Sequence, residues 1–132
     1  MNKQHEESFE KYLTKGGLPC IDVTIKNKQY VFLIDCGSDI SYIDSNIAED
    51  LELPIIDGMT TIVTTIGYES PESVTYQVNV QLSQSTLNVN ATGVELCATT
   101  KNLIVPFCGI LGVDVLSQLG AEISFSQNKL IY

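Results

Sequence analysis

The segment YVFLIDCGSDISYID, residues 30–44, constrains the fold more than any other part of the chain. Four apolar residues, 31–34, run straight into Asp35, and Cys36 and Gly37 follow before a more polar run begins. An apolar run of this length, bounded by a turn former, is typical of a buried strand. The pattern therefore predicts a strand that ends on an acid at the edge of the core, followed by a sharp turn that Gly37 permits.

An acid in this position has two interpretations. A carboxylate beside a low-dielectric core, with turn amides within reach, suits a group that must hold or release a proton near the working pH. Alternatively, Asp35 only caps the turn through its side chain, which is a common role of aspartate. Taken by itself, this segment favours the capping interpretation.

The rest of the chain consists mainly of short strand patterns. One short helix is predicted within 5–15, where three apolar side chains share a face, and Gly16 and Gly17 end it. A second helix is predicted over 44–53, with Asp44 or Ser45 as N-cap. Strands and strand-like runs are predicted at 21–26, 29–35, 40–43, 59–67, 73–82, 86–98, 109–111, 121–125 and 129–132.

Turn signals separate these strands. They lie at 27–28, at 57–58 and around 67–71, and the run at 109–120 reads as a strand, a glycine turn and a short helix. In that helix Asp114 is the predicted N-cap, and Gly120 is predicted to follow the last turn. Many short strands with few helices predict an all-β, closed or barrel-like domain.

Composition excludes several classes of function. The chain of 132 residues has a formal net charge of -9, from seven lysines, no arginine and sixteen acids. This balance disfavours nucleic acid and anionic membrane surfaces as partners. The longest apolar run, 103–113, is too short to span a bilayer, and residues 1–13 lack the apolar core of a signal peptide, so a cytoplasmic location is expected.

The cysteines and the histidine do not form a recognisable site. Four widely spaced cysteines without a CxxC pattern predict reduced, mostly buried thiols rather than a disulfide framework or a zinc site: Cys20, Cys36, Cys97 and Cys108. A nucleophilic pair of Cys36 with His5 is disfavoured because no third orienting group is visible. Asp39 and Asp44 predict a solvated acidic edge rather than a calcium loop, and no metal or cofactor is expected.

Two motifs together suggest a family. The run FLIDCGSDISYI at 32–43 and the run GILGVDVLSQLGAEISFSQNKLIY at 109–132 resemble the retropepsin-like aspartic proteases, which carry two apolar residues before D-T-G or D-S-G. Their later apolar-apolar-glycine element corresponds to Ile110, Leu111 and Gly112, a structural glycine turn. The resemblance covers residues 20–132 and implies an all-β closed barrel of the acid protease type with one or two short helices. It places a single domain at 17–132, preceded by a polar, helical extension at 1–16.

The resemblance also implies a mechanism. Members of this family contribute one aspartate per chain and act as homodimers, in which two carboxylates share a proton and activate a water against a peptide bond. Asp35 is the catalytic position, and Cys36, Gly37 and Ser38 form the active-site loop. Only Gly37, of all the glycines, has an aspartate two residues before it, so one chain alone cannot form the dyad. The implied partners are a second copy and a peptide or protein substrate.

Two departures from the family leave alternatives open. The hairpin 64–78, with Gly67 and Tyr68 near its tip, matches the flap that closes over substrate, but it has fewer glycines than usual, and an ordinary surface hairpin is an equal interpretation. Cys36 replaces the usual Thr or Ser, whose hydroxyl braces the dimer. Three alternatives follow. The site is active but less rigid, or it is degenerate and kept as a peptide-binding or dimerisation module, or its activity is redox-sensitive. A β scaffold without a groove is a further alternative.

Overall fold

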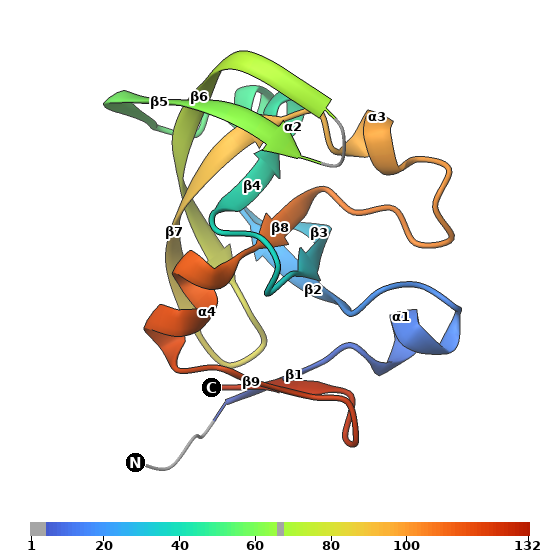
Figure 1. Cartoon of the computed structure of the whole chain (residues 1–132). Helices are drawn as coiled ribbons and strands as arrows, with labels where there is room; N and C mark the ends of the chain where they lie inside the picture. The colour runs from blue at the N-terminus through green and yellow to red at the C-terminus, as the bar shows by residue number, and fades with distance from the viewer. Residues whose placement is uncertain (1–4, 66–67) are drawn as a thin grey trace.

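The structure is a computed structural model that describes residues 5–65 and 68–132, with side chains described for 5–56 and 74–132. Within these ranges the chain forms ten strands and four short helices, the longest of which has seven residues. Strands therefore account for most of the regular structure. Figure 1 shows them arranged as a barrel, with a smaller sheet below it.

Six strands close into a barrel of mixed parallel and antiparallel pairs, in the order β2-β3-β8-β4-β7-β6 (Figure 1). A pairing of Thr24 on β2 with Gln81 on β6 completes the ring, and β5 pairs with β6 outside it. The predicted closed β barrel is thus confirmed. The strands are β2 (Cys20–Ile25), β3 (Lys28–Ile34), β4 (Ser41–Asp44), β5 (Ile55–Thr65), β6 (Tyr68–Gln81), β7 (Thr86–Val94) and β8 (Gly109–Leu111).

A second, three-stranded sheet joins both ends of the described chain. It has the order β1-β10-β9, with β1 (Glu6–Ser8), β10 (Lys129–Ile131) and β9 (Glu122–Ser124) all antiparallel. The predicted closing hairpin of β9 and β10 is confirmed. The helix predicted within 5–15 is shorter than expected: β1 takes its first part, and α1 covers only Glu10–Thr14. Phe9, between them, is fully buried in the main core, so this part of the segment packs against the domain.

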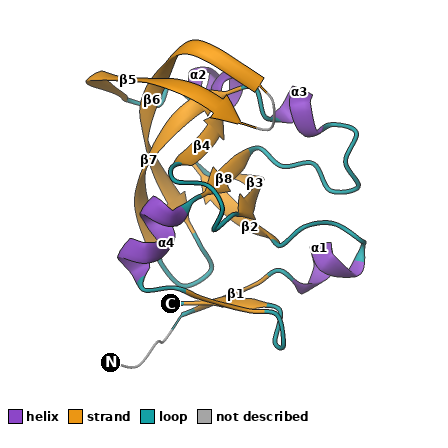
Figure 2. Cartoon of the chain, in the orientation of Figure 1, coloured by secondary structure: helices purple, strands orange, loops and turns teal. Residues whose placement is uncertain are grey.

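Short helices lie around the barrel (Figure 2). They are α2 (Ser45–Asp50), α3 (Cys97–Thr100) and α4 (Val113–Leu119). Asp44 caps α2 as predicted, since its carboxylate accepts the Ile47 N–H at 3.2 Å. Gly120 follows α4 with a left-handed φ of 61°, also as predicted. The helix α3 was not expected, because its first two residues were assigned to the end of the strand predicted at 86–98.

Tight turns follow the backbone preferences of their residues. The β2–β3 hairpin turns at Lys26 and Asn27, both with positive φ, one residue earlier than predicted. The turn predicted at 57–58 is wrong, because β5 runs through these positions with an irregular register against β6. The β5–β6 hairpin lies at the opposite end of the barrel from the β1-β10-β9 sheet in Figure 1. Its connection, 66–67, lies outside the described residues.

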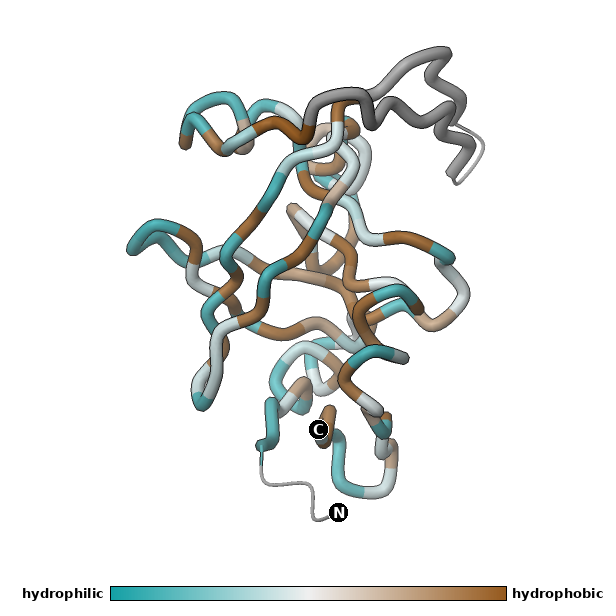
Figure 3. Tube along the Cα trace, turned by 90° about the vertical axis from the view of Figure 1, so that its left-hand side faces the viewer, coloured by the Kyte–Doolittle hydropathy of each residue, from teal (hydrophilic) through white to brown (hydrophobic). Residues whose placement is uncertain are grey.

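The barrel is filled by the apolar faces of its strands. Apolar and polar residues alternate along the chain in Figure 3, as expected for strands with one face in the core. Tyr42, Tyr76 and Phe107, which the sequence suggested as core or groove residues, are all buried. Gly109 is needed for close packing: a Cβ there would lie 2.2 Å from the ring of Phe32, its partner on β3. A parallel pair of strands is thereby held tightly together, and both end at the candidate site.

Candidate functional site

The site is built where β3 and β8 end side by side. These strands pair in parallel, with Ile34 opposite Leu111, so Asp35 and Gly112 leave the sheet together. The Asp35 N–H donates to the Leu111 carbonyl oxygen at 3.0 Å, which extends the ladder by one more bond. Asp35 is thereby fixed to the barrel wall by its backbone. The chain then turns, since the Ser38 N–H donates to the Asp35 carbonyl oxygen at 3.2 Å.

The Asp35 side chain is half-buried and lightly engaged. Its Oδ1 accepts the backbone N–H of Gly37 at 2.9 Å, and among the described residues this is the only donor to the carboxylate. A carboxylate can accept about four hydrogen bonds, so most of its capacity is unused. The geometry includes the turn-capping bond that the sequence suggested. It also leaves an oxygen available for a water, a substrate or a second carboxylate.

Gly112 packs directly against the backbone of the loop that follows Asp35. A Cβ at this position would lie 2.4 Å from the Ile40 carbonyl oxygen and 2.7 Å from that of Ser38, so no larger residue fits without moving the loop. The Val113 N–H donates to the Ser38 carbonyl oxygen at 2.8 Å. Two segments about seventy residues apart in sequence are therefore packed backbone to backbone.

Ser41 and Asp114 connect the same two segments through side chains. The Ser41 hydroxyl donates to Asp114 Oδ1 at 2.8 Å and accepts the Gly112 N–H at 3.0 Å. The Ser41 N–H donates to Asp114 Oδ2 at 3.0 Å. The prediction that Asp114 is the N-cap of α4 is therefore wrong. Asp114 lies in the first turn of the helix, and Gly112 occupies the N-cap position. The polar pair was missed because nothing local in the sequence shows that the two residues meet.

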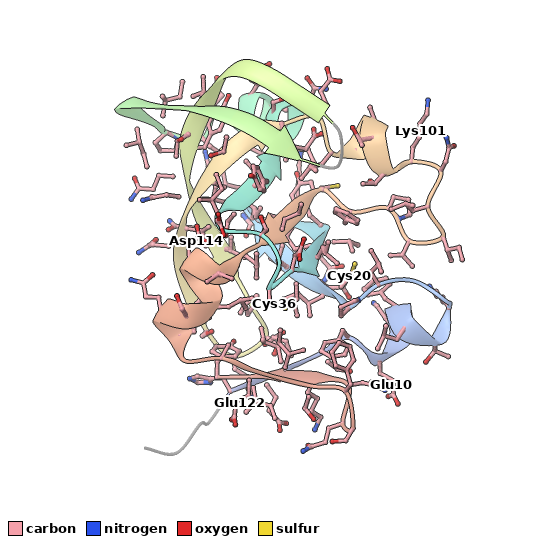
Figure 4. All side chains as sticks on the ribbon, viewed as in Figure 1. Glu10, Cys20, Cys36, Lys101, Asp114 and Glu122 are labelled. Carbon is pink, nitrogen blue, oxygen red and sulfur yellow. The ribbon has the colours of Figure 1, made fainter. Side chains whose placement is uncertain are left out.

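Cys36 lies at the exposed surface of the loop between β3 and β4, while Asp114 lies on α4 (Figure 4). The prediction of mostly buried thiols is therefore wrong, because only Cys20 is fully buried and Cys97 and Cys108 are half-buried. Burial raises the pKa of the Cys20 thiol to about 12, with a smaller contribution from the charge of Asp22. Cys20 is thus unreactive at neutral pH, whereas Cys36 is accessible.

An apolar cavity of about 280 Å³ opens beside the carboxylate. Asp35 and Cys36 form its polar edge, and the exposed side chains of Leu18 and Phe125 contribute to its walls. The remaining lining residues are Pro19, Leu33, Ile34 and Ile123. They come from β3, from the segment before β2 and from β9, so three parts of the chain converge here. A cavity of this size and character suits an apolar side chain rather than a large polar ligand.

The remaining predicted residues are distributed as follows. Gly67 lies outside the described residues, and Tyr68 begins β6 with its side chain outside the described set. His5 packs against the ring of Tyr132, with ring centroids 5.3 Å apart. Asp39 is exposed as expected for a solvated edge, but Asp44 is not: its side chain is buried against backbone N–H groups.

Two general features of the described residues bear on other functions. Among the residues searched, no group of three or more His, Cys, Asp or Glu side chains is placed to hold a metal ion. In the same part of the chain, no helix is both long and apolar enough to cross a membrane.

Comparison with known proteins agrees with this geometry. The sequence pattern of the family described as aspartyl protease matches residues 21–115, most of the chain. No curated protein sequence matches significantly. The retroviral protease-like domain of Ddi1 from Leishmania major is similar in structure, with a TM-score of 0.61, 18% identity and 84% of each chain covered.

Two viral proteases are also similar in structure. The EIAV protease, in complex with the inhibitor HBY-793, has a TM-score of 0.56 and 21% identity, with 82% of this chain and 93% of that chain covered. The protease of simian foamy virus (mac) has a TM-score of 0.50 and 16% identity, with coverages of 76% and 94%. At these identities the likeness concerns the fold, whereas the sequence match over 21–115 concerns descent. The chain therefore belongs to the aspartyl protease family and has the retropepsin-like fold.

Proposed function

We propose that this protein is an aspartic endopeptidase in which Asp35 of each of two identical chains forms the catalytic dyad. The observation that carries the proposal is the geometry of Asp35. Its backbone is fixed to the Leu111 carbonyl oxygen, and its carboxylate holds a single described hydrogen bond, from Gly37. A catalytic acid needs this combination of a fixed position and free acceptor capacity. Membership of the aspartyl protease family supports the same role.

The chemistry follows from pairing two such groups. Two carboxylates about 3 Å apart cannot both be charged at low cost, so they share one proton. The charged partner takes a proton from a water that attacks the peptide carbonyl, and the protonated partner donates a hydrogen bond to the developing oxyanion. Because the sequence holds one Asp-X-Gly motif, the second carboxylate comes from a second copy of the chain.

The cavity beside Asp35 supports a substrate class. Its walls are apolar, and among the described residues that line it only Asp35 and Cys36 are ionisable. Burying an apolar side chain there is favourable by about 1.5–3 kcal/mol, while a charged side chain would lose its hydration. The proposed substrate is thus an extended peptide with an apolar residue next to the cleaved bond. The same proposal includes the β5–β6 hairpin as the flap that covers the bound peptide.

Cys36 favours one alternative, a degenerate domain that binds peptides or dimerises without cleaving them. A thiol is a weaker hydrogen-bond donor than the hydroxyl of Thr or Ser, so it holds the two loops of a dimer less firmly. Cys36→Thr distinguishes the two functions. An enzyme limited by this thiol gains activity on the substitution, whereas a domain that lacks activity for other reasons gains none.

The dyad is tested by mixing chains. Native chain and Asp35→Asn are unfolded together at equal concentration and refolded, and cleavage of a peptide library is measured at several values between about pH 4 and pH 7. If both acids of a dimer are needed, random pairing leaves one dimer in four active, because half multiplied by half is a quarter. Independent monomers would keep half of the activity of native chain at the same total concentration. A mixture at half, or hydrolysis by pure Asp35→Asn, contradicts the proposal.

Sedimentation equilibrium of the native chain provides the matching control. The same concentrations that show peptide cleavage should show a mass of two chains, and dilution should reduce both in parallel. A chain that remains monomeric while cleaving peptides would exclude the shared dyad. A dimer without cleavage, also after Cys36→Thr, would support the binding module instead.

A further inference from the structure

Two thiols away from the Asp35 corner lie in contact. The Sγ atoms of Cys97 and Cys108 are 3.1 Å apart, although the residues are eleven positions apart in sequence. Cys97 is the first residue of α3, and Cys108 directly precedes β8. Both side chains are half-buried, and both are free thiols in the structure. A disulfide bond is ~2.05 Å long, so a movement of about 1 Å brings the sulfur atoms to bonding distance.

The backbones of both cysteines are fixed by one buried residue. The Asp44 N–H donates to the Cys108 carbonyl oxygen at 2.8 Å, and Asp44 Oδ1 accepts the Cys97 N–H at 2.9 Å. On the other side, the Cys108 N–H donates to the Val31 carbonyl oxygen at 2.8 Å. Asp44 is only 2% exposed, so these bonds are shielded from water. The fold itself therefore holds the two sulfur atoms together, without relying on motion of the intervening loop.

Thr100 makes a second connection across the same loop. Its buried hydroxyl donates to the Phe107 carbonyl oxygen at 3.0 Å and accepts the Phe107 N–H at 3.2 Å. The contacts Thr100–Phe107 and Cys97–Cys108 are thus two successive links between the segments that enter and leave the loop 101–106. The inner link therefore already holds these two segments together beside the thiol pair.

The loop lines a second cavity that adjoins the one at the candidate active site. Leu103 and Ile104 are exposed apolar residues, and with Leu18 they line a cavity of about 230 Å³. Leu18 also lines the cavity that contains Asp35. In Figure 1 the loop extends from α3 and returns to β8, next to the α1 region. The thiol pair therefore lies at the base of a loop whose cavity shares one wall residue, Leu18, with the cavity beside the acid.

We propose that Cys97 and Cys108 form a reversible disulfide that fixes the base of this loop under oxidising conditions. With hydrogen peroxide as the oxidant, the Cys108 sulfur attacks an oxygen, the O–O bond breaks, and a sulfenic acid and a water form. The Cys97 sulfur then attacks the Cys108 sulfur, releasing a second water. Two thiols lose two electrons and two protons to one peroxide, and a dithiol reductant reverses the change. The site is independent of the function proposed for Asp35.

The order of the two steps follows from the hydrogen bond between the thiols. Cys97 donates its S–H to the Cys108 sulfur, and this bond stabilises a thiolate at Cys108, so the first attack is assigned to Cys108. Burial, together with the hydrogen bond to Cys108, raises the pKa of the Cys97 thiol to about 12. Cys97 therefore stays protonated and does not attack peroxide itself. It takes the second step because the sulfenic acid forms in contact with it, and its proton leaves with the sulfenic oxygen as water.

Peptide mapping tests the bond directly. Lys101 is the only lysine between the two cysteines, so lysine-specific cleavage separates them into fragments 29–101 and 102–129. Cys36 lies in the first fragment and is removed by Cys36→Ser, which makes any link unambiguous. After peroxide treatment and blocking of free thiols, this variant should yield the two fragments joined, lighter than their sum by two hydrogen atoms, and a dithiol should separate them.

Stability provides a second readout. Closing a loop of this length restricts the unfolded chain, so oxidation should raise the melting temperature by roughly 5–15 °C in the Cys36→Ser variant. The rise should be absent in Cys97→Ser and in Cys108→Ser. Fragments that remain separate after peroxide treatment overturn the proposal, and this measurement holds even if the latter two variants fold poorly.

Discussion

Asp35 and Asp44 lie nine residues apart, each at the end of a strand of the same barrel, yet their surroundings differ sharply. The Asp44 carboxylate is buried and accepts three backbone N–H groups, from Ile47, Leu96 and Cys97. The Asp35 carboxylate is half-buried and accepts one described N–H, from Gly37. A carboxylate whose acceptors are occupied holds the structure together, whereas one with unused acceptors can bind water or substrate. The structural acid is thus both buried and fully engaged by backbone donors, whereas the candidate catalytic acid is more exposed and has unused acceptor capacity.

The largest expected effect is on activity at Asp35. Asp35→Asn should lower kcat/KM for peptide cleavage by roughly 10⁴-fold, about 5.5 kcal/mol in the barrier, because an amide cannot act as the base. The free energy of unfolding should change by less than about 0.5 kcal/mol, since the amide oxygen still accepts from Gly37. Kinetics and urea unfolding measure the two quantities. A large loss of stability would mean that Asp35 is structural, and the contrast with Asp44 would fail.

The next effect is on stability at Asp44. Asp44→Ala leaves three backbone N–H groups unpaired in a buried site and should lower the free energy of unfolding by about 4 kcal/mol. The matched control is Asp39→Ala, an exposed acid in the loop before β4, which should change the free energy of unfolding by less than about 0.5 kcal/mol. Urea titration of both variants decides the matter. Equal losses in the two variants would show that the bonds to Asp44 contribute little.

A moderate effect is expected at Ser41, which supports the Asp35 loop without contacting the acid. Ser41→Ala removes the hydroxyl between Asp114 Oδ1 and the Gly112 N–H and should cost about 2 kcal/mol of unfolding free energy. Ser117→Ala, which removes an exposed helix hydroxyl, serves as the control. If Ser41 positions the loop, kcat falls more than KM rises. A change in stability with unaltered kcat would limit Ser41 to a role in folding.

The smallest effect belongs to Asp22, an acid on the outer face of β2. Burial alone would raise the pKa of Asp22, but hydrogen bonds from Lys11 and Tyr12 outweigh it and lower the pKa below its ordinary value. The stabilisation is therefore present at neutral pH and is lost as the pH falls through the lowered pKa. Asp22→Asn should cost less than about 1 kcal/mol at pH 7, because the ion pair is exposed and screened.

The control for Asp22 is the dependence on pH. Native chain and Asp22→Asn should differ in urea midpoint at about pH 7 and converge well below about pH 4, where the native carboxyl is protonated. A difference that grows as the pH falls would have the wrong sign for a carboxyl with a lowered pKa. Such a result would remove Asp22 from the group of acids stabilised as anions.

Features that depend on neighbours in sequence could be predicted from it. The β2–β3 hairpin follows from alternating side chains and a turn that accepts positive φ, and the cap at Asp44 and the glycine after α4 follow from local hydrogen bonding. The paired motifs around Asp35 and Gly112 predicted the barrel because they resemble those of a known family. These signals are short-range or carried by a pattern that is already familiar.

Features that depend on distant contacts could not be predicted. Residues 6–8 are polar and look helical, and they form β1 only because β10 offers a pairing edge more than a hundred residues away. Asp44 reads as a surface acid until its bonds to Leu96 and Cys97 are known. The contact of Cys97 with Cys108 depends on the same residue. In each case the deciding partner lies on another strand or loop, which local sequence does not specify.

The barrel closes through a single residue pair, Thr24 with Gln81, whereas neighbouring strands elsewhere in the ring share two to seven pairs. Because β2 and β6 share a single residue pair, we expect these two strands to separate by local opening before any other neighbouring strands do. Amide protons near Thr24 on that side should exchange with solvent sooner than those facing β3. In such an opening β6 and β7 would move away from β2 together, while the pairing of β7 with β4 keeps them attached to the barrel.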